Sequence, residues 1–162
     1  MRYLIYVDGS AQNNKKNIDN IGGFGYVVLD NQNNIIDAYS KIVNNTTNNE
    51  MELSALHQAI LDYGTSDLWS APDIFLDSQY TLKSVTIWHR KWINNGWKTA
   101  ENKPVENKEL INNIINLLAD GKHFANLYYC KGHSGIYGNE IADRLATGKL
   151  SPQEVLNDHF VL

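Results

Sequence analysis

The chain has 162 residues, 43% of them hydrophobic and 20% charged, and a formal net charge of −4. These values are typical of a soluble globular protein, and the length predicts one domain over residues 1–162. No apolar run approaches the roughly 20 residues of a membrane helix, which argues against a membrane protein. The N-terminus becomes polar too soon for a secretory signal, and the single cysteine, Cys130, fits a reducing compartment. We therefore expect a cytoplasmic protein.

The charged residues are distributed unevenly along the chain. Residues 79–133 contain eight Lys or Arg and four Asp or Glu, whereas the rest of the chain contains six and fourteen. This division suits a protein that binds phosphates with one part and collects cations with another. Chance clustering of solvated charges explains it equally well at this point.

The first half of the chain predicts three strands and a helix. Residues 2–7, 22–30 and 34–43 are rich in β-branched and aromatic residues and are separated by polar, Asn-rich segments. Strands in this order should pair as an antiparallel meander. A helix is expected from about 48 to 63, where apolar residues recur at helical spacing.

The second half of the chain alternates strands and helices. We expect strands at 73–76 and 125–131, and helices at about 79–92, 106–121 and 138–148. A meander followed by alternating helices and strands predicts an α/β fold, with a mixed sheet and helices on both faces.

Glu52 is unusual because the helix pattern places it on the apolar face. Leu56, Ala59, Ile60 and Tyr63 lie one to three turns further along that face. A buried carboxylate takes up a proton, finds a partner or binds a cation. The alternative is an ordinary first-turn acid that favours the helix N-terminus and stays in water.

Other acids are expected to converge on Glu52. The first strand is predicted to end at Asp8 and the fourth at Asp77, and ligands gather at the carboxyl ends of strands in such sheets. The last helix adds Asp143, and the loop before it contains His133. Converging carboxylates repel one another, and a hard divalent cation is what such a cluster best accommodates.

Five motifs along the chain resemble the type 1 ribonuclease H family, in its order and spacing. They are "YVDGS", "TNNEMELSA", "LDSQY", "NNGWKTAENKPVEN" and "YCKGHSGIYGNEIADRLA", and the match runs from Asp8 to about Ala146. The resemblance implies a ribonuclease H-like fold with a five-stranded mixed sheet. It also implies an endonuclease that hydrolyses the RNA strand of RNA–DNA hybrids with two Mg²⁺ ions, for which Mn²⁺ can substitute. The products would carry 5′-phosphate and 3′-hydroxyl ends.

The resemblance also assigns roles to individual residues. The catalytic carboxylates that hold the two metal ions would be Asp8, Glu52, Asp77 and Asp143. His133 would be the mobile loop histidine of the site, where an imidazole could assist proton transfer to the leaving group or product release.

Substrate contacts follow from the same resemblance. Residues 79–108 would include the basic protrusion, in which Trp88, Arg90, Lys91 and Lys98 hold the hybrid, whereas Trp92 is interpreted as packing. Thr47 and Asn107 would form a pocket for a phosphate of the DNA strand. The residues expected to read the minor groove are Asn48, Asn49 and Gln79. We expect a monomer with an RNA–DNA hybrid as its partner.

The chain also departs from the family pattern. The loop at 11–21 is long, Asn94 and Asn95 stand where many relatives have basic residues, and Glu50 adds an acid beside the site. Two alternatives therefore stay open: a DNA-cutting nuclease with the same fold, and a hybrid-binding module without catalysis. A DNA-cutting enzyme would have no evident use for Asn48, Asn49 and Gln79, and an idle module would not need all four acids.

Overall fold

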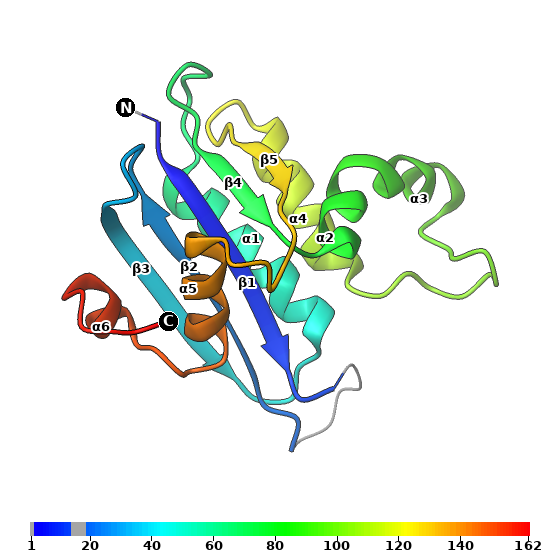
Figure 1. Cartoon of the computed structure of the whole chain (residues 1–162). Helices are drawn as coiled ribbons and strands as arrows, with labels where there is room; N and C mark the ends of the chain where they lie inside the picture. Colours follow the sequence, from blue (N-terminus) through cyan, green and yellow to red (C-terminus); the bar gives the residue numbers. More distant parts are fainter. Residues whose placement is uncertain (1, 14–18) are drawn as a thin grey trace.

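A five-stranded mixed sheet forms the centre of the computed structural model, which describes residues 2–13 and 19–162. Residues 14–18 of the long loop lie outside this range. The first three strands are β1 (Leu4–Ala11), β2 (Gly22–Leu29) and β3 (Ile35–Val43), and they pair antiparallel in chain order (Figure 1). The predicted meander is confirmed.

Two short strands extend the sheet beyond β1. They are β4 (Asp73–Leu76) and β5 (Asn126–Tyr129), and both run parallel to β1, which gives the order β3-β2-β1-β4-β5. Parallel pairing places the carboxyl ends of β1, β4 and β5 toward the same end of the sheet (Figure 1). The predicted mixed sheet is therefore confirmed.

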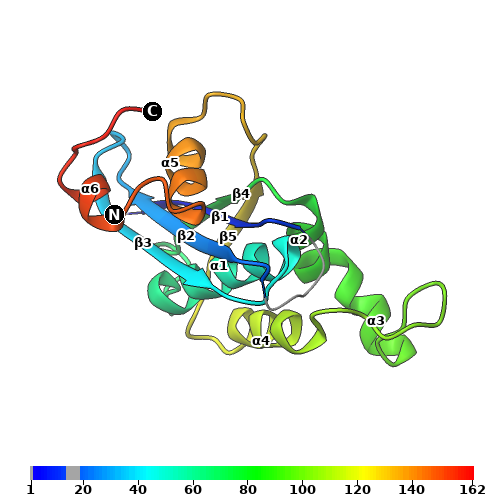
Figure 2. The same ribbon diagram turned by 90° about the horizontal axis from the view of Figure 1, so that it is seen from below.

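Helices cover both faces of the sheet. Figure 2 shows α1 (Asn48–Tyr63) and α4 (Lys108–Ala119) on one face, with α5 (Tyr137–Ala146) and α6 (Pro152–Leu156) on the other. Helix α6 was not predicted from the sequence, although a capping box of Ser151 and Glu154 marks its start.

Each face of the sheet has its own hydrophobic cluster. The larger one lies between the sheet and the pair α1 and α4, and it includes Leu53, Leu56 and Ile60, which are fully buried. The smaller one lies under α5 and α6 and includes Leu145 and Val155. Among the described residues, no helix has both the length and the apolar character needed to cross a bilayer.

The helical stretch expected at about 79–92 is confirmed, although it is not one uniform α-helix. The chain instead forms α2 (Gln79–Lys83), a π-helical turn η1 (Ser84–Trp88) and α3 (His89–Asn95). Three consecutive β-branched residues at 85–87 weaken helix propensity, and the Thr86 hydroxyl donates to the Leu82 carbonyl at 2.6 Å. Helix α3 and the loop after it project from the body of the molecule (Figure 1).

Candidate active site

Asp8 and Asp77 lie side by side because their strands are neighbours. Val7 of β1 is in register with Leu76 of β4, and each aspartate is the next residue along its strand. The prediction that β1 ends at Asp8 is wrong, because β1 continues to Ala11 by pairing with β2. β4 stops at Leu76 and β5 at its partner Tyr129, so Asp8 is the first residue of β1 beyond the pairing with β4.

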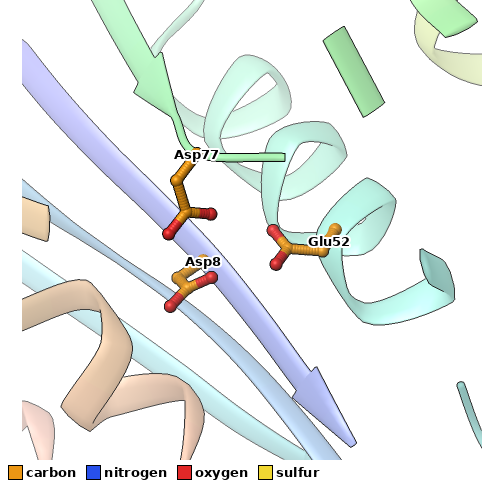
Figure 3. Close-up of side chains that lie close together, drawn as sticks. All are labelled: Asp8, Glu52 and Asp77. Atoms are coloured by element: carbon orange, nitrogen blue, oxygen red, sulfur yellow. The ribbon is translucent and has the colours of Figure 1, made fainter. Parts of the chain in front are cut away.

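Helix α1 brings Glu52 to the same point. The helix packs directly on β1 at Gly9, where an added Cβ would lie only 2.2 Å from the Met51 carbonyl carbon. One carboxylate oxygen each from Asp8, Glu52 and Asp77 lies within 4.8 Å of the others, and the three side chains point toward one another (Figure 3). The structure thus places Glu52 inward, as the helix pattern predicted.

Among the described residues, no positively charged side chain contributes to the pKa shifts of Asp8 and Glu52. Burial and the neighbouring Asp77 raise the pKa of Asp8 to about 8, although a hydrogen bond with Glu52 partly offsets the rise. Burial and the charges of Asp8 and Asp77 hold the pKa of Glu52 well above its usual range. In the part of the chain that the structure describes, Glu52 Oε2 is buried and has no hydrogen-bond partner. A cation would satisfy this oxygen and favour the ionised forms.

The donor set fits a hard divalent cation. All three side chains offer carboxylate oxygens, which Mg²⁺ and Mn²⁺ prefer, whereas zinc sites usually include sulfur or imidazole nitrogen. Cys130 is buried after β5, and burial with the charges of Asp77 and Asp8 raises its pKa to about 11. It therefore stays a neutral thiol, a poor metal ligand.

Helix α5 supports the cluster from the other side of the sheet. Asp143 is half-buried on α5, and its charge contributes to the raised pKa of Asp8, although it lies outside the group of three oxygens. Asn139, one turn earlier and 2% exposed, donates from Nδ2 to Asp77 Oδ2 at 3.2 Å. This contact orients Asp77. The sequence offered only a weak signal for it, namely the four-residue spacing from Asp143.

The loop before α5 brings its backbone to Asp77. A Cβ at Gly132 would lie 2.6 Å from Asp77 Oδ2, so a larger residue there would displace the Asp77 carboxylate. His133 follows in an exposed, left-handed conformation with φ 53°. The structure therefore places His133 on the loop beside the cluster and shows it exposed to solvent.

The expected groove-reading residues cluster at two helix starts. Thr47 caps α1, with Oγ1 accepting from Glu50 N at 3.1 Å, and Asn48 Oδ1 accepts from Ala11 N at 2.6 Å. Asn49 is half-buried on the first turn of α1. Gln79 is the exposed first residue of α2, close in sequence to Asp77.

A pocket beside Asn107 has an acidic lining, and Thr47, the other residue expected to bind a phosphate, does not line it. Asn107 begins α4 with φ 60°, and its Nδ2 donates to the Tyr80 hydroxyl at 3.3 Å. A shallow pocket of about 340 Å³ beside it is lined by Glu50, Asn107, Glu109, Leu110 and Asn113. The structure brings Asn107 and the helix start at Glu50 to one pocket, but two carboxylates share it.

The protrusion combines aromatic rings with exposed cations. Trp88 and Trp92 lie 5.9 Å apart between ring centroids, and Trp97 continues the row at 5.8 Å from Trp92. Trp92 thus packs between two other rings, as expected. A groove of about 330 Å³ runs beside them and is lined in part by Trp88, Lys91 and Lys98. Arg90 is exposed on the same helix as Lys91.

Comparison with known proteins identifies the family. The family model described as RNase H matches residues 1–151. The ribonuclease H of Orientia tsutsugamushi (strain Boryong) is 36% identical over 156 residues, which cover 96% of this chain and 86% of that protein. The ribonuclease H of Chromohalobacter salexigens is 39% identical over 147 residues, 90% of this chain and 82% of that protein. The solved structure of LC9-RNase H1, described as a type 1 RNase H with the type 2 active-site motif, aligns with a TM-score of 0.71 and 26% identity, covering 89% of this chain and 69% of that one. The chain belongs to the ribonuclease H family.

Proposed function

We propose that this protein is an endonuclease that cleaves the RNA strand of RNA–DNA hybrids and requires divalent metal ions. The observation that carries the proposal is the convergence of Asp8, Glu52 and Asp77, with oxygens within 4.8 Å and a buried oxygen of Glu52 that lacks a protein partner among the described residues. Family membership supports the reaction class.

The carboxylates would hold the metal and define where the scissile phosphate binds. Asp8, Glu52 and Asp77 would hold Mg²⁺ or Mn²⁺, and Asp143 would complete a two-ion site from α5. When bound, two such ions activate the attacking water and stabilise the departing oxygen, which leaves 5′-phosphate and 3′-hydroxyl ends. Asn139 keeps Asp77 turned toward the site through its hydrogen bond. His133, exposed on its loop, would carry a proton to or from the products, because an imidazole nitrogen can both accept and donate a proton.

Recognition of the hybrid would begin at the start of α1. Because Asn48 Oδ1 already accepts from Ala11 N, the Nδ2 of Asn48 is the group left to face the substrate as a donor. Minor-groove base edges and the RNA 2′-hydroxyl offer acceptors for it. Asn49 and Gln79 would add contacts to the same groove, and Thr47 with Asn107 would contact a DNA phosphate.

The protrusion would bind the hybrid at a distance from the scissile phosphate. Trp88 is 38% exposed, enough to lie against a sugar or base, while Arg90, Lys91 and Lys98 are exposed for phosphates. This division of labour predicts that the protrusion affects KM more than kcat. A cytoplasmic location and a monomeric state stay predictions from the sequence.

One cleavage assay tests the proposal. The same base sequence is presented as RNA–DNA hybrid, RNA duplex and DNA duplex, with Mg²⁺ and with EDTA, and products are resolved on a denaturing gel. We expect cleavage of the hybrid's RNA strand alone, only with Mg²⁺, and none by the Asp8→Asn variant, which still binds the hybrid. Asp158→Asn is the matched control. It removes the charge of an exposed carboxylate after α6, and asparagine tolerates the positive φ of 58° at this position. Cleavage of the DNA duplex would favour the alternative of a DNA-cutting nuclease with the same fold. Hybrid binding without cleavage would favour the alternative of a non-catalytic hybrid-binding module.

A further inference from the structure

Asn20 is a buried polar residue at the end of the loop between β1 and β2, and it is only 2% exposed. Its Nδ2 donates to the carbonyls of Thr46, at 2.5 Å, and Asn13, at 2.9 Å. Its Oδ1 accepts from Asn13 N at 3.2 Å, and its own carbonyl accepts from Thr46 N at 3.2 Å. Asn20 therefore connects the two ends of the loop, at Asn13 and Asn20, to Thr46 in the segment that precedes α1. We call this set of hydrogen bonds the Asn20 clamp.

This clamp fixes the residues that come next in the chain. Thr46 is fully buried and is also held from the side, because a Cβ at Gly22 would lie 2.7 Å from Thr46 Cγ2. Two residues later, Asn48 is tied to the other stem of the loop through Ala11 N at 2.6 Å. The start of α1 is thus attached to the two ends of the loop at two points, Thr46 and Asn48, directly before Asn49.

We propose that Asn20 is a positioning residue for hybrid recognition, which acts through residues 46–49 and touches no substrate itself. The inference rests on the proposed function, since it concerns the residues that would read the hybrid. Contacts to a groove require side chains to be placed within about half an ångström, which depends on the groups that hold them. The described ends of the loop, at Asn13 and Asn20, would then support this segment.

The simple alternative is that Asn20 only stabilises the fold. Losing a buried amide that is hydrogen-bonded to Asn13 and Thr46 destabilises the protein under either view, so a fall in Tm alone does not distinguish them. The two views differ in KM. A purely structural residue leaves the KM of the folded enzyme unchanged, whereas a positioning residue raises KM for the hybrid and leaves kcat at saturating hybrid largely intact.

The test compares Asn20→Ala with Asn126→Ala. Asn126 also donates a side-chain hydrogen bond, to Asp73 Oδ1 at 3.1 Å, but it lies at the start of β5, away from the carboxyl ends of the strands. We expect Asn20→Ala to raise KM by about five- to thirtyfold with kcat within about twofold of wild type. Asn126→Ala should lower Tm without changing KM. The backbone bond between Asn20 and Thr46 survives either side-chain change, which favours folding of the variant.

A double mutant tests the route through α1. If Asn20 acts through Asn48, the KM increase of Asn20→Ala combined with Asn48→Ala should be well below the product of the two single increases. Asn20→Ser is uncharged and loses the amide, so it should also raise KM and replaces the alanine variant if that one is unfolded.

Three results would overturn the inference. An unchanged KM in a folded Asn20 variant would leave Asn20 a purely structural residue. Fully multiplicative effects with Asn48→Ala would mean that the clamp does not act through the start of α1. Absence of Mg²⁺-dependent cleavage by the wild-type protein would instead refute the proposed function, and the inference with it, before any variant is compared.

Discussion

Replacing Asp8 with asparagine should make the metal-free protein more stable while it abolishes cleavage. Asp8 is 5% exposed, and burial with the nearby Asp77 raises its pKa to about 8. In the unfolded chain the same carboxyl ionises near its ordinary value, about 3.9. Between about pH 4 and pH 8 the folded state therefore binds more protons than the unfolded state, so stability falls as the pH rises through this window. Asparagine has nearly the same shape, can still accept from Gly9 N, and never ionises.

The size of the effect follows from the pKa shift. At pH 7 the raised pKa of Asp8 can lower the free energy of unfolding by at most about 4 kcal/mol. Water penetration and relaxation reduce such values in real proteins, so we expect a gain of about 1–3 kcal/mol. For a chain of this length that corresponds to a Tm increase of about 3–10 °C. The loss of one negative charge also lowers the pKa of Glu52, since Asp8 is one cause of its rise.

The assay is thermal unfolding in EDTA at pH 5, 7 and 8, for wild type, Asp8→Asn and the surface control Asp158→Asn. Wild-type Tm should fall from pH 5 to pH 8, and the advantage of Asp8→Asn should grow over the same range. The control variant should follow wild type. If Asp8→Asn has no higher Tm than wild type at pH 8, or the same Tm difference at every pH, the carboxylates do not repel one another in the folded state. Our account of the site would then be wrong.

Three further predictions follow from the structure. Adding Mg²⁺ or Mn²⁺ should raise wild-type Tm more at pH 8 than at pH 5, and should raise it less for Asp8→Asn, because the ion competes with protons for the same oxygens; equal shifts would place the ion elsewhere. Alanine replacement of Arg90, Lys91 and Lys98 together should flatten the slope of log affinity against log salt by up to roughly 0.9 per lost phosphate contact, with kcat nearly unchanged; a collapsed kcat with normal KM would mean that the protrusion shapes the active site. Tyr26→Phe should cost about 1–2 kcal/mol in chemical denaturation, because the Tyr26 hydroxyl donates to Asp62 Oδ2 at 2.7 Å; an unchanged midpoint would show that water replaces the bond without cost.

Local signals explain which parts of the fold the sequence predicted. Helix α1 spans Asn48–Tyr63 as expected, because Thr47 caps its start and Gly64 ends it, and both signals lie in the helix itself or beside it. The end of β1 was misplaced because "GSA" has no strand preference of its own. Those residues are extended only because β2 pairs with them, which is a contact between distant parts of the chain.

The same distinction applies to the site. Asp8, Glu52 and Asp77 were found because each carboxylate interrupts a local apolar pattern, which sequence reading detects directly. The role of Asn20 had no such signal: it sits in an Asn-rich loop, and its partner Thr46 is 26 residues away. Hydrogen bonds between distant segments depend on the folded backbone and leave no periodicity in the sequence.

The acid cluster must be held in place by the rest of the fold, because repulsion and burial both disfavour it. Glu52 is attached to a helix whose next turns bury Leu53, Leu56 and Ile60 completely against the sheet. Each such side chain contributes about 1.5–3 kcal/mol of burial, so the helix cannot rotate to release Glu52 without losing more than the carboxylate would gain. The close approach of α1 to β1 at Gly9 also leaves no room for the helix to move further toward the sheet. The protein therefore cannot relieve the repulsion by moving its backbone, and what remains is to take up a proton or a cation. This is why we expect the metal-free form to be less stable at high pH, and why the proposed metal sensitivity and the proposed catalysis share one cause.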